Sequence, residues 1–145
     1  MEGTRMKKEM EIVAALIGHQ GKILLCQRNP EDHYGLLWEF PGGKVEPEET
    51  LTAAIEREIE EELDIEIKAE DLIGEFTDEN PFLKITVSLF RCRIKKGRPR
   101  TKDCHALRFL SLSEAGTMDL APVDRKILAA LTSAADHSPR RRSSK

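Results

Sequence analysis

Residues 50–63 form the stretch whose fold is most restricted by its sequence. Its apolar residues recur at intervals of three and four positions, and they are Leu51, Ala54, Ile55, Ile59 and Leu63. Because an α-helix repeats about every 3.6 residues, this interval places them on one face of a helix. Thr50 is of a type that often precedes the first helical turn and accepts a hydrogen bond from it. The stretch therefore predicts an amphipathic helix with one buried face.

Apolar runs rich in β-branched residues occupy much of the remaining chain and predict strands. The predicted strands are residues 11–18, 22–28, 36–40, 65–77, 84–94 and 106–112. The turn residues 19–21 favour a hairpin between the first two. A second helix is expected over residues 123–135, where the helical spacing returns. Strands and helices that do not alternate regularly favour an α+β fold, in which a mixed, curved sheet is flanked by two helices.

Length and charge narrow the classes of protein to consider. The 145 residues predict a single domain over residues 9–136, a flexible N-terminus over 1–8 and a disordered basic tail over 137–145. The net charge of −3 offers no general attraction for nucleic acids or anionic membranes. No apolar run approaches the ~20 residues needed to cross a bilayer, and no secretory signal is evident. A cytoplasmic protein without a membrane partner is expected.

The three cysteines, Cys26, Cys92 and Cys104, are odd in number and widely spaced. No two of them are spaced as a CxxC pair, and two of them lie within apolar runs that predict strands. This pattern favours buried, reduced thiols over a metal site or a disulfide.

Three glutamates crowd the second half of the predicted helix. Glu58, Glu61 and Glu62 are three and four residues apart, so their carboxylates should lie on one patch. Each pair of like charges costs roughly a few tenths of a kcal/mol there, and the helix dipole also disfavours anions near a C-terminus. A bound Mg²⁺ or Mn²⁺ would compensate, because hard cations take carboxylate oxygens. The glutamates alone are, however, more typical of a solvated helix face than of a metal site.

The wider spacing distinguishes these two interpretations. The residues concerned are Gly43, Glu49, Arg57, Glu58, Ile59, Glu61, Glu62, Asp64 and Ile65. Their series resembles the signature of the Nudix family: glycine, five residues, glutamate, seven residues, Arg-Glu, an aliphatic residue, one residue, Glu-Glu, one residue, glycine and an aliphatic residue. Asp64 stands where the family has glycine. We expect Asp64 to end the helix in the left-handed conformation, at a cost of ~1 kcal/mol relative to glycine.

This resemblance implies a Nudix fold, an α/β/α sandwich around the mixed sheet, and a divalent-metal cofactor, Mg²⁺ or Mn²⁺. The implied metal ligands are the backbone carbonyl of Gly42 and the side chains of Glu58, Glu61 and Glu62. Arg57 would orient these carboxylates, with Glu49 as its partner in a charge-assisted pair. Glu58 or another loop carboxylate would take a proton from the attacking water. Asp103 matches a position from which an acidic residue reaches the metal in related enzymes, and a plain surface aspartate is the alternative.

Outside the signature, residues 24–28 and 38–46 resemble the MutT branch of nucleotide-pool enzymes. This likeness implies that Arg28 contacts substrate phosphate and that the nucleoside pocket is lined by His33, Glu39 and Phe40. Residues 120–124 resemble bacterial enzymes of the CTP pyrophosphohydrolase type, whereas MutT-type purine enzymes have asparagine at position 124. An ionised Asp124 only accepts hydrogen bonds, which suits the amino group of cytosine. The alternative for Asp124 is an N-cap of the second helix.

The resemblance thus predicts an enzyme that cleaves nucleoside triphosphates to monophosphates and pyrophosphate, in sanitation of the nucleotide pool. Cytosine-containing or modified nucleotides are the expected substrates. One alternative is an 8-oxo-dGTP diphosphatase of the MutT type. Another is a catalytically silent Nudix module that binds nucleotides or RNA through residues 95–102 and the basic tail. A nucleoside triphosphate is the expected partner, without a stable nucleic-acid partner, and the protein is expected to be a monomer or homodimer.

Overall fold

The computed structural model describes residues 7–136, so most of the N-terminal segment and the whole basic tail of the sequence prediction lie outside it. The elements in chain order are β1 (Lys8–His19), β2 (Lys22–Gln27), β3 (Trp38–Glu39), β4 (Gly42–Lys44), α1 (Leu51–Leu63), β5 (Glu66–Glu79), β6 (Leu83–Lys96), β7 (Ala106–Leu110), α2 (Leu112–Ala115) and α3 (Pro122–Asp136). β1 begins one residue before the predicted domain boundary at residue 9. Within the described residues, no helix is both long and apolar enough to span a membrane.

The strands form one mixed sheet in the order β3-β2-β1-β6-β5, with β4 also paired to β1 and β7 to β2. β1 and β6 run parallel at its centre, from the pair Lys8–Leu83 to the pair Ile17–Cys92. β1 and β2 are the predicted hairpin, but they pair only beside their turn. Beyond it β2 leaves β1 and pairs with β3 and β7. The sheet is therefore curved, as predicted.

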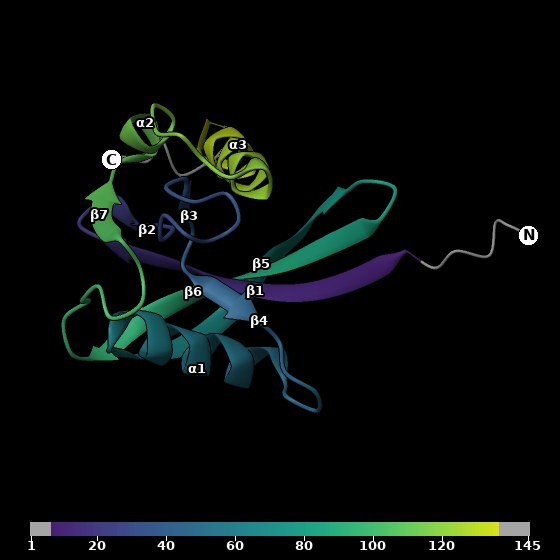
Figure 1. The fold of residues 1–145 in the computed structure, drawn as a ribbon. Coiled ribbons are helices and arrows are strands. Elements are labelled where there is room, and N and C mark those ends of the chain that lie inside the picture. Colours follow the sequence, from purple (N-terminus) through teal and green to yellow (C-terminus); the bar gives the residue numbers. More distant parts are fainter. Residues whose placement is uncertain (1–6, 137–145) are drawn as a thin grey trace, which may run out of the picture.

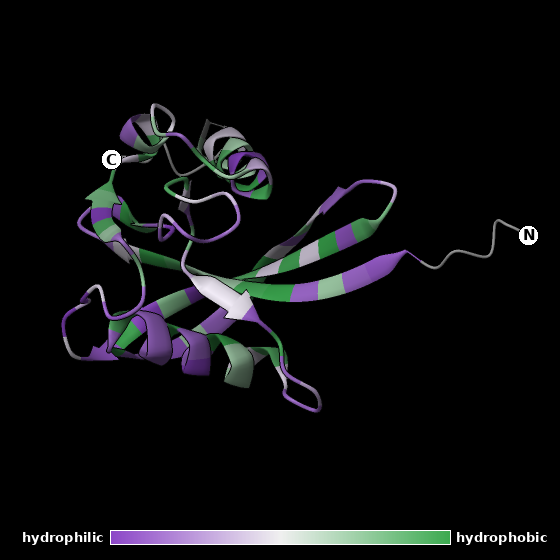
Figure 2. Ribbon diagram, viewed as in Figure 1, coloured by the Kyte–Doolittle hydropathy of each residue, from purple (hydrophilic) through white to green (hydrophobic). Residues whose placement is uncertain are grey.

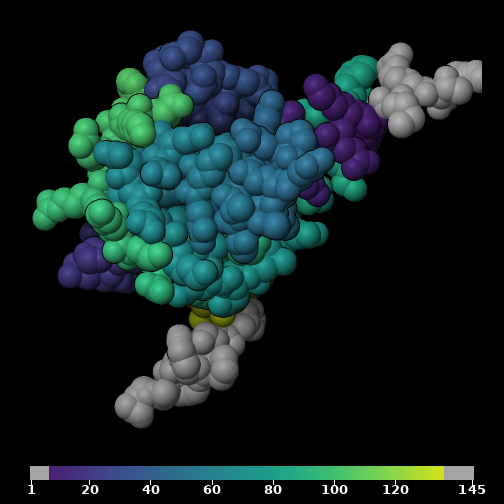
Figure 3. Space-filling model, turned by 90° about the horizontal axis from the view of Figure 1, so that it is seen from below, coloured from purple at the N-terminus to yellow at the C-terminus, as the bar shows by residue number. Residues whose placement is uncertain are grey.

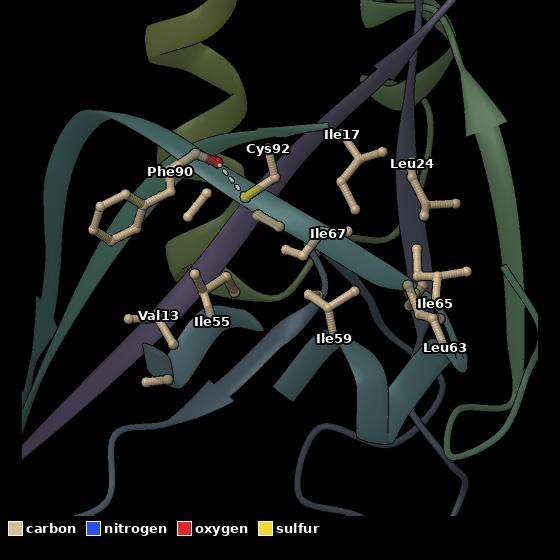
Figure 4. Packing of buried hydrophobic residues seen from close by; sticks show 14 of the residues in the cluster. Val13, Ile17, Leu24, Ile55, Ile59, Leu63, Ile65, Ile67, Phe90 and Cys92 are labelled. Carbon is tan, nitrogen blue, oxygen red and sulfur yellow. Dashed lines mark hydrogen bonds between the residues drawn. The ribbon is translucent and has the colours of Figure 1, made fainter. Parts of the chain in front are cut away.

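Helices cover both faces of this sheet, as Figure 1 shows, with α1 on one side and α2 and α3 on the other. The strands that lie between them are largely hydrophobic, whereas the outer surface of α1 is largely hydrophilic (Figure 2). On the α1 side, Ile55 and Ile59 pack in one cluster with Val13 and Phe90 (Figure 4). Burial of each such aliphatic side chain is worth ~1.5–3 kcal/mol. These contacts fix α1, and with it the glutamates, against the sheet.

Both ends of α1 are as predicted. Thr50 accepts a hydrogen bond from the backbone N–H of Ala53 at 3.1 Å. Asp64 is left-handed, with φ 60° and ψ 39°. Beyond it, the backbone N–H groups of Arg100 and Asp103 donate to the carbonyls of Leu63 and Glu62, at 2.9 and 3.0 Å. Helix-terminal carbonyls lack partners within the helix. The loop between β6 and β7 supplies them and is thereby fixed to the glutamate end of α1.

Two of the predicted strands are shorter than expected. The strand predicted over residues 36–40 is reduced to Trp38–Glu39, because Leu36 has a positive φ of 68° that a strand cannot contain. The strand predicted over 106–112 ends at Leu110. Ser111 and Glu114 there form a reciprocal capping box that starts α2, a helix that the sequence analysis did not predict.

Candidate active site

Arg57 is the centre of a network of carboxylates on the outer side of α1. Its Nε and Nη2 bond the two oxygens of Glu49 at 2.6 and 2.9 Å, which is a bidentate pair. Its Nη1 lies 3.0 Å from an oxygen of Glu58 and 3.2 Å from one of Glu61. The guanidinium lowers the pKa of Glu49 to about 2. Arg57 therefore holds three signature carboxylates near one another and offsets their repulsion.

The two glycines before α1 are needed for close approach. A Cβ at Gly43 would lie 2.2 Å from the carboxyl carbon of Glu58. A Cβ at Gly42 would lie 1.9 Å from the backbone oxygen of Val13. The backbone N–H of Gly42 donates to Glu62 at 3.1 Å. Since glycine alone leaves this space free, the loop can lie directly on the carboxylates. Figure 3 shows this face of the molecule, with α1 and the loop before it at its centre.

Glu62 differs from Glu58 and Glu61, the other two glutamates of the predicted metal site, because it is only 9% exposed. Burial raises its pKa well above the usual value, and Glu39 and Cys104 add to the rise. Between residues 7 and 136, no lysine, arginine or histidine side chain forms an ion pair with it. A buried carboxylate without a cationic partner is costly. Glu62 is therefore a side chain that a bound cation would stabilise.

Glu58, Glu61 and Glu62 are less convergent than the sequence analysis expected. Glu58 and Glu61 both turn toward Arg57, and the Glu61 side chain is 60% exposed. Glu62 turns instead to the backbone of Gly42. Helical spacing places the three on one side but does not fix their rotamers. Their hard oxygen donors fit Mg²⁺ or Mn²⁺. Their role as ligands, like that of the Gly42 carbonyl, stays a prediction.

The predicted substrate-binding residues form a second group around β3, the loop before it and the first turn of α3. Arg28 pairs with Glu39 at 2.9 Å and donates to the backbone oxygen of His33 at 2.6 Å. The backbone N–H of Phe40 donates to Asp124 at 2.9 Å. Burial raises the pKa of Glu39, and Arg28 offsets part of the rise. The structure thus brings Arg28, Glu39 and Asp124 into one electrostatic group.

Phe40 and His33, which were predicted to line the nucleoside pocket, have different surroundings from each other. The Phe40 ring is buried in the core cluster beneath α3, so its backbone rather than its ring faces Asp124. The His33 imidazole is exposed and lies against Tyr34, with ring centroids 4.1 Å apart. Tyr34 and Leu36 are exposed on the same loop at positive φ. Neither residue was predicted to have this backbone conformation, and Leu36 was expected in a strand.

Asp124 does not cap α3. The helix begins at Pro122, so Asp124 lies in its first turn, and its side chain reaches back to the strand that contains Phe40. The side chain is buried, and this burial raises its pKa to about 8, with Glu39 adding to the rise. At neutral pH the carboxyl is then protonated. It can therefore donate as well as accept a hydrogen bond.

Asp103 lies at the glutamate end of α1, where its backbone N–H donates to the carbonyl of Glu62. Its side chain is exposed, and among the described residues it forms no ion pair. Its neighbour Cys104 is buried and lies with Cys26 beside Glu62. All three cysteines are free and buried, as predicted. The sequence analysis did not foresee that two of them meet a signature glutamate, because the pairing depends on the sheet topology.

Comparisons with known proteins agree with this geometry. A family model described as the NUDIX domain matches residues 7–131. The chain is 37% identical over 123 residues to the CTP pyrophosphohydrolase of Escherichia coli, covering 85% of this chain and 91% of that protein. It is 35% identical over 122 residues to a putative 8-oxo-dGTP diphosphatase 2 of Mycobacterium tuberculosis, covering 83% of this chain and 86% of that one.

Solved structures show the same fold. The solution structure of the ORF135 protein of E. coli superposes with a TM-score of 0.79 at 35% identity, covering 92% of this chain and 95% of that one. The MutT protein of Methanosarcina mazei superposes with a TM-score of 0.80 at 24% identity, covering 91% and 99%. Together with the Arg57 network and the glycine-bounded carboxylates, these matches identify an α+β Nudix fold of the MutT type. The chain belongs to the Nudix family of hydrolases.

Proposed function

We propose that this protein hydrolyses nucleoside triphosphates to the monophosphate and pyrophosphate, with Mg²⁺ or Mn²⁺ as its cofactor. The observation that carries the proposal is the contact between Gly43 and the carboxyl group of Glu58, with Arg57 behind it. If the glutamates were only an exposed, solvated face of α1, the residue at position 43 would not need to be glycine. Glu58, Glu61, Glu62 and the carbonyl of Gly42 would hold the cation.

The side chains of the Arg57 network support a hydrolytic reaction. A bound divalent cation would supply Lewis-acid stabilisation of phosphoryl oxygens and a more acidic water. Burial raises the pKa of Glu58, although Arg57 counteracts part of this effect. A carboxylate with a raised pKa is a stronger base, so Glu58 is the proposed proton acceptor. Arg57 and Glu49 keep its oxygens in position. Asp103 is proposed to act with these carboxylates, because its backbone is bonded to Glu62 near the C-terminal end of α1.

The nucleotide is proposed to lie across Arg28 and Asp124. Arg28 would bind phosphate oxygens once its pair with Glu39 opens, and residues 33–40 would border the base. The raised pKa of Asp124 changes the argument for cytosine, since a protonated carboxyl also donates. It can accept from the cytosine amino group and donate to the adjacent ring nitrogen. A cytosine nucleotide is also favoured by the similarity to the CTP pyrophosphohydrolase of E. coli.

A panel of nucleotides tests this proposal. Purified protein with Mg²⁺ is incubated with CTP, dCTP, 5-methyl-dCTP, GTP and 8-oxo-dGTP, and pyrophosphate release gives kcat/KM for each. We expect pyrophosphate from at least one triphosphate, with the cytosine nucleotides preferred. Because the MutT-type purine enzymes that the chain resembles have asparagine at this position, Asp124→Asn should shift the ratio of kcat/KM from cytosine toward oxidised guanine. Thr132→Ala, on the exposed side of the same helix, is the control and should leave this ratio unchanged.

The second candidate is sanitation of 8-oxo-dGTP. It is favoured by the similarity to the putative 8-oxo-dGTP diphosphatase 2 of M. tuberculosis and by the donor capacity of a protonated Asp124 toward a guanine carbonyl oxygen. A higher kcat/KM for 8-oxo-dGTP than for every cytosine nucleotide would establish it in place of the first. No turnover of any triphosphate, or orthophosphate as the only product, would refute both.

A further inference from the structure

Cys26, Cys104 and Glu62 come from three separate parts of the chain and meet at one point. Cys26 lies near the end of β2, Glu62 near the end of α1, and Cys104 in the loop before β7. Their sulfur atoms and one carboxylate oxygen all lie within 4.8 Å of one another. Within the described residues this is the one group of three histidine, cysteine or carboxylate side chains brought so close together.

The backbone on either side of Cys104 fixes its place in this group. The residue before it, Asp103, donates its N–H to the carbonyl of Glu62 at 3.0 Å. The residue after it, His105, donates to the carbonyl of Gln27 at 2.9 Å, next to Cys26. Cys104 therefore lies between two residues whose backbone is bonded to that of Glu62 on one side and to that of Gln27, next to Cys26, on the other. The convergence of the three side chains is a consequence of the fold.

The surroundings of these thiols differ from those of an ordinary core cysteine. Cys92 is such a cysteine: it packs among apolar side chains, and its Sγ donates to the carbonyl of Phe90 at 3.5 Å (Figure 4). The Sγ of Cys104 likewise donates to a backbone carbonyl, that of Ala106, at 3.4 Å. Cys26 and Cys104, at 0% and 8% exposure, differ from Cys92 in lying beside a carboxylate that is itself 9% exposed. None of the lysine, arginine or histidine side chains in residues 7–136 pairs with that carboxylate. Two thiols and a carboxylate with no cationic partner form a set of donor atoms that a cation can bind.

We propose that Cys26, Cys104 and Glu62 form a binding site for a thiophilic divalent cation such as Zn²⁺. Zn²⁺ is bound in proteins by thiolate sulfur and carboxylate oxygen, and two ligand atoms on one tetrahedral ion lie roughly 3.5–4 Å apart. The observed spacing of at most 4.8 Å needs only a small contraction to match. Mg²⁺ and Mn²⁺ prefer oxygen donors, so the two thiols discriminate against them. Water can complete the fourth position.

Glu62 links this site to the proposed catalytic cation, and this step rests on the proposed function. A carboxylate that binds Zn²⁺ beside the two thiols is withdrawn from the set formed with Glu58 and Glu61. Zn²⁺ should therefore inhibit hydrolysis even when Mg²⁺ is in excess. Loss of either thiol should relieve the inhibition and leave the oxygen donors for Mg²⁺ in place.

Cobalt spectroscopy tests the site without any substrate. Metal-free, reduced protein is titrated with Co²⁺, whose bonds to thiolates give a charge-transfer band in the near ultraviolet. We expect a band with the intensity of two thiolates per bound cobalt, which Zn²⁺ then abolishes by displacement. Cys104→Ser and Cys26→Ala should each weaken the affinity by at least ~10-fold. Cys92→Ser, a change at an equally buried thiol outside the site, should leave the titration unchanged.

Several results would overturn the site. They are the absence of a thiolate band in the wild-type protein, a band that survives both Cys104→Ser and Cys26→Ala, and a band that Cys92→Ser removes. The wild-type intensity decides the matter even if a variant fails to fold. Zn²⁺ inhibition that is equal in wild type and Cys104→Ser would refute the link through Glu62. Failure of nucleotide hydrolysis alone would leave the cobalt result intact and refute only the proposed function.

Discussion

The carboxyl group of Glu58 fills the space that a side chain at position 43 would need. Gly43→Ala should therefore displace Glu58 by an amount comparable with an atomic radius. Displacements of about 1 Å at a catalytic group can cost ~10²-fold in rate, and we expect a fall in kcat of that order. Gly18→Ala is the matched control, because its Cβ would meet its nearest neighbour at an ordinary 3.7 Å. Equal activity of the two variants would show that catalysis does not require the Glu58 carboxyl group to lie beside Gly43.

Asp124 makes stability depend on pH in an unusual direction. Its pKa is about 8 in the folded protein and close to 4 in the unfolded chain. Between these values the folded state binds more protons, so the free energy of unfolding falls as pH rises, by up to ~1.4 kcal/mol per pH unit. The contribution is complete below about pH 4 and is lost as pH passes 8.

Melting temperatures of the wild type and Asp124→Asn from pH 5 to pH 9 test this. The asparagine amide keeps an acceptor for the Phe40 N–H but cannot ionise. We expect the wild type to lose stability relative to the variant as pH rises to about 8, and no further beyond. A constant difference between the two proteins over this range would mean that Asp124 is ionised throughout.

Single residues also mark the limit of what the sequence could predict. The resemblance to the Nudix signature implied the pairing of Arg57 with Glu49, which the structure shows. The burial of Asp124 and Glu62 could not be predicted, because it depends on which strands and loops cover them. For the same reason the meeting of Cys104 with Cys26 was missed. A prediction from local pattern cannot include contacts that the sheet topology creates.

At the scale of elements, α1 is the segment that the sequence predicted most completely, because its apolar period, N-cap and left-handed end are all local features. Its end offers a test. Asp64 is left-handed, a conformation in which glycine is more stable by ~1 kcal/mol. Its exposed contact with Arg100, at 3.5 Å, is worth little. Asp64→Gly should raise the melting temperature by about 2–4 °C without changing activity. A lower melting temperature would contradict the cost assigned to this conformation.

The shorter elements were predicted less well. β3 is only two residues long, and the loop before it contains two residues at positive φ, Tyr34 and Leu36. Turn residues such as Asn29, Pro30 and Gly35 favour a loop here, but neither Tyr34 nor Leu36 is of a type that marks a positive φ. α2 did carry a local signal, since Ser111 and Glu114 have the spacing of a capping box. The missing helix was thus predictable from its cap, whereas the positive φ angles of Tyr34 and Leu36 were not.

For the molecule as a whole, the residues proposed for cation binding and those proposed for base recognition come from helices on opposite faces of the sheet. α1 supplies the carboxylates on one face, and the first turn of α3 brings Asp124 from the other to the edge at Phe40. The parallel pairing of β1 and β6 could not be predicted from strand patterns, because a strand buried on both faces shows no alternation. The order of strands and helices predicted a mixed sheet flanked by two helices, and the family resemblance added its arrangement as an α/β/α sandwich.

Identification of the products of triphosphate hydrolysis tests the central claim most directly. Phosphorus NMR of a reaction with CTP and Mg²⁺ should show pyrophosphate and the nucleoside monophosphate. Glu58→Gln should lower kcat by ~10² or more, as expected for loss of a proton acceptor. Glu60→Gln, an exposed neighbour on the same helix, should keep the wild-type rate. Orthophosphate as the only inorganic product, or equal rates for the two variants, would contradict the account.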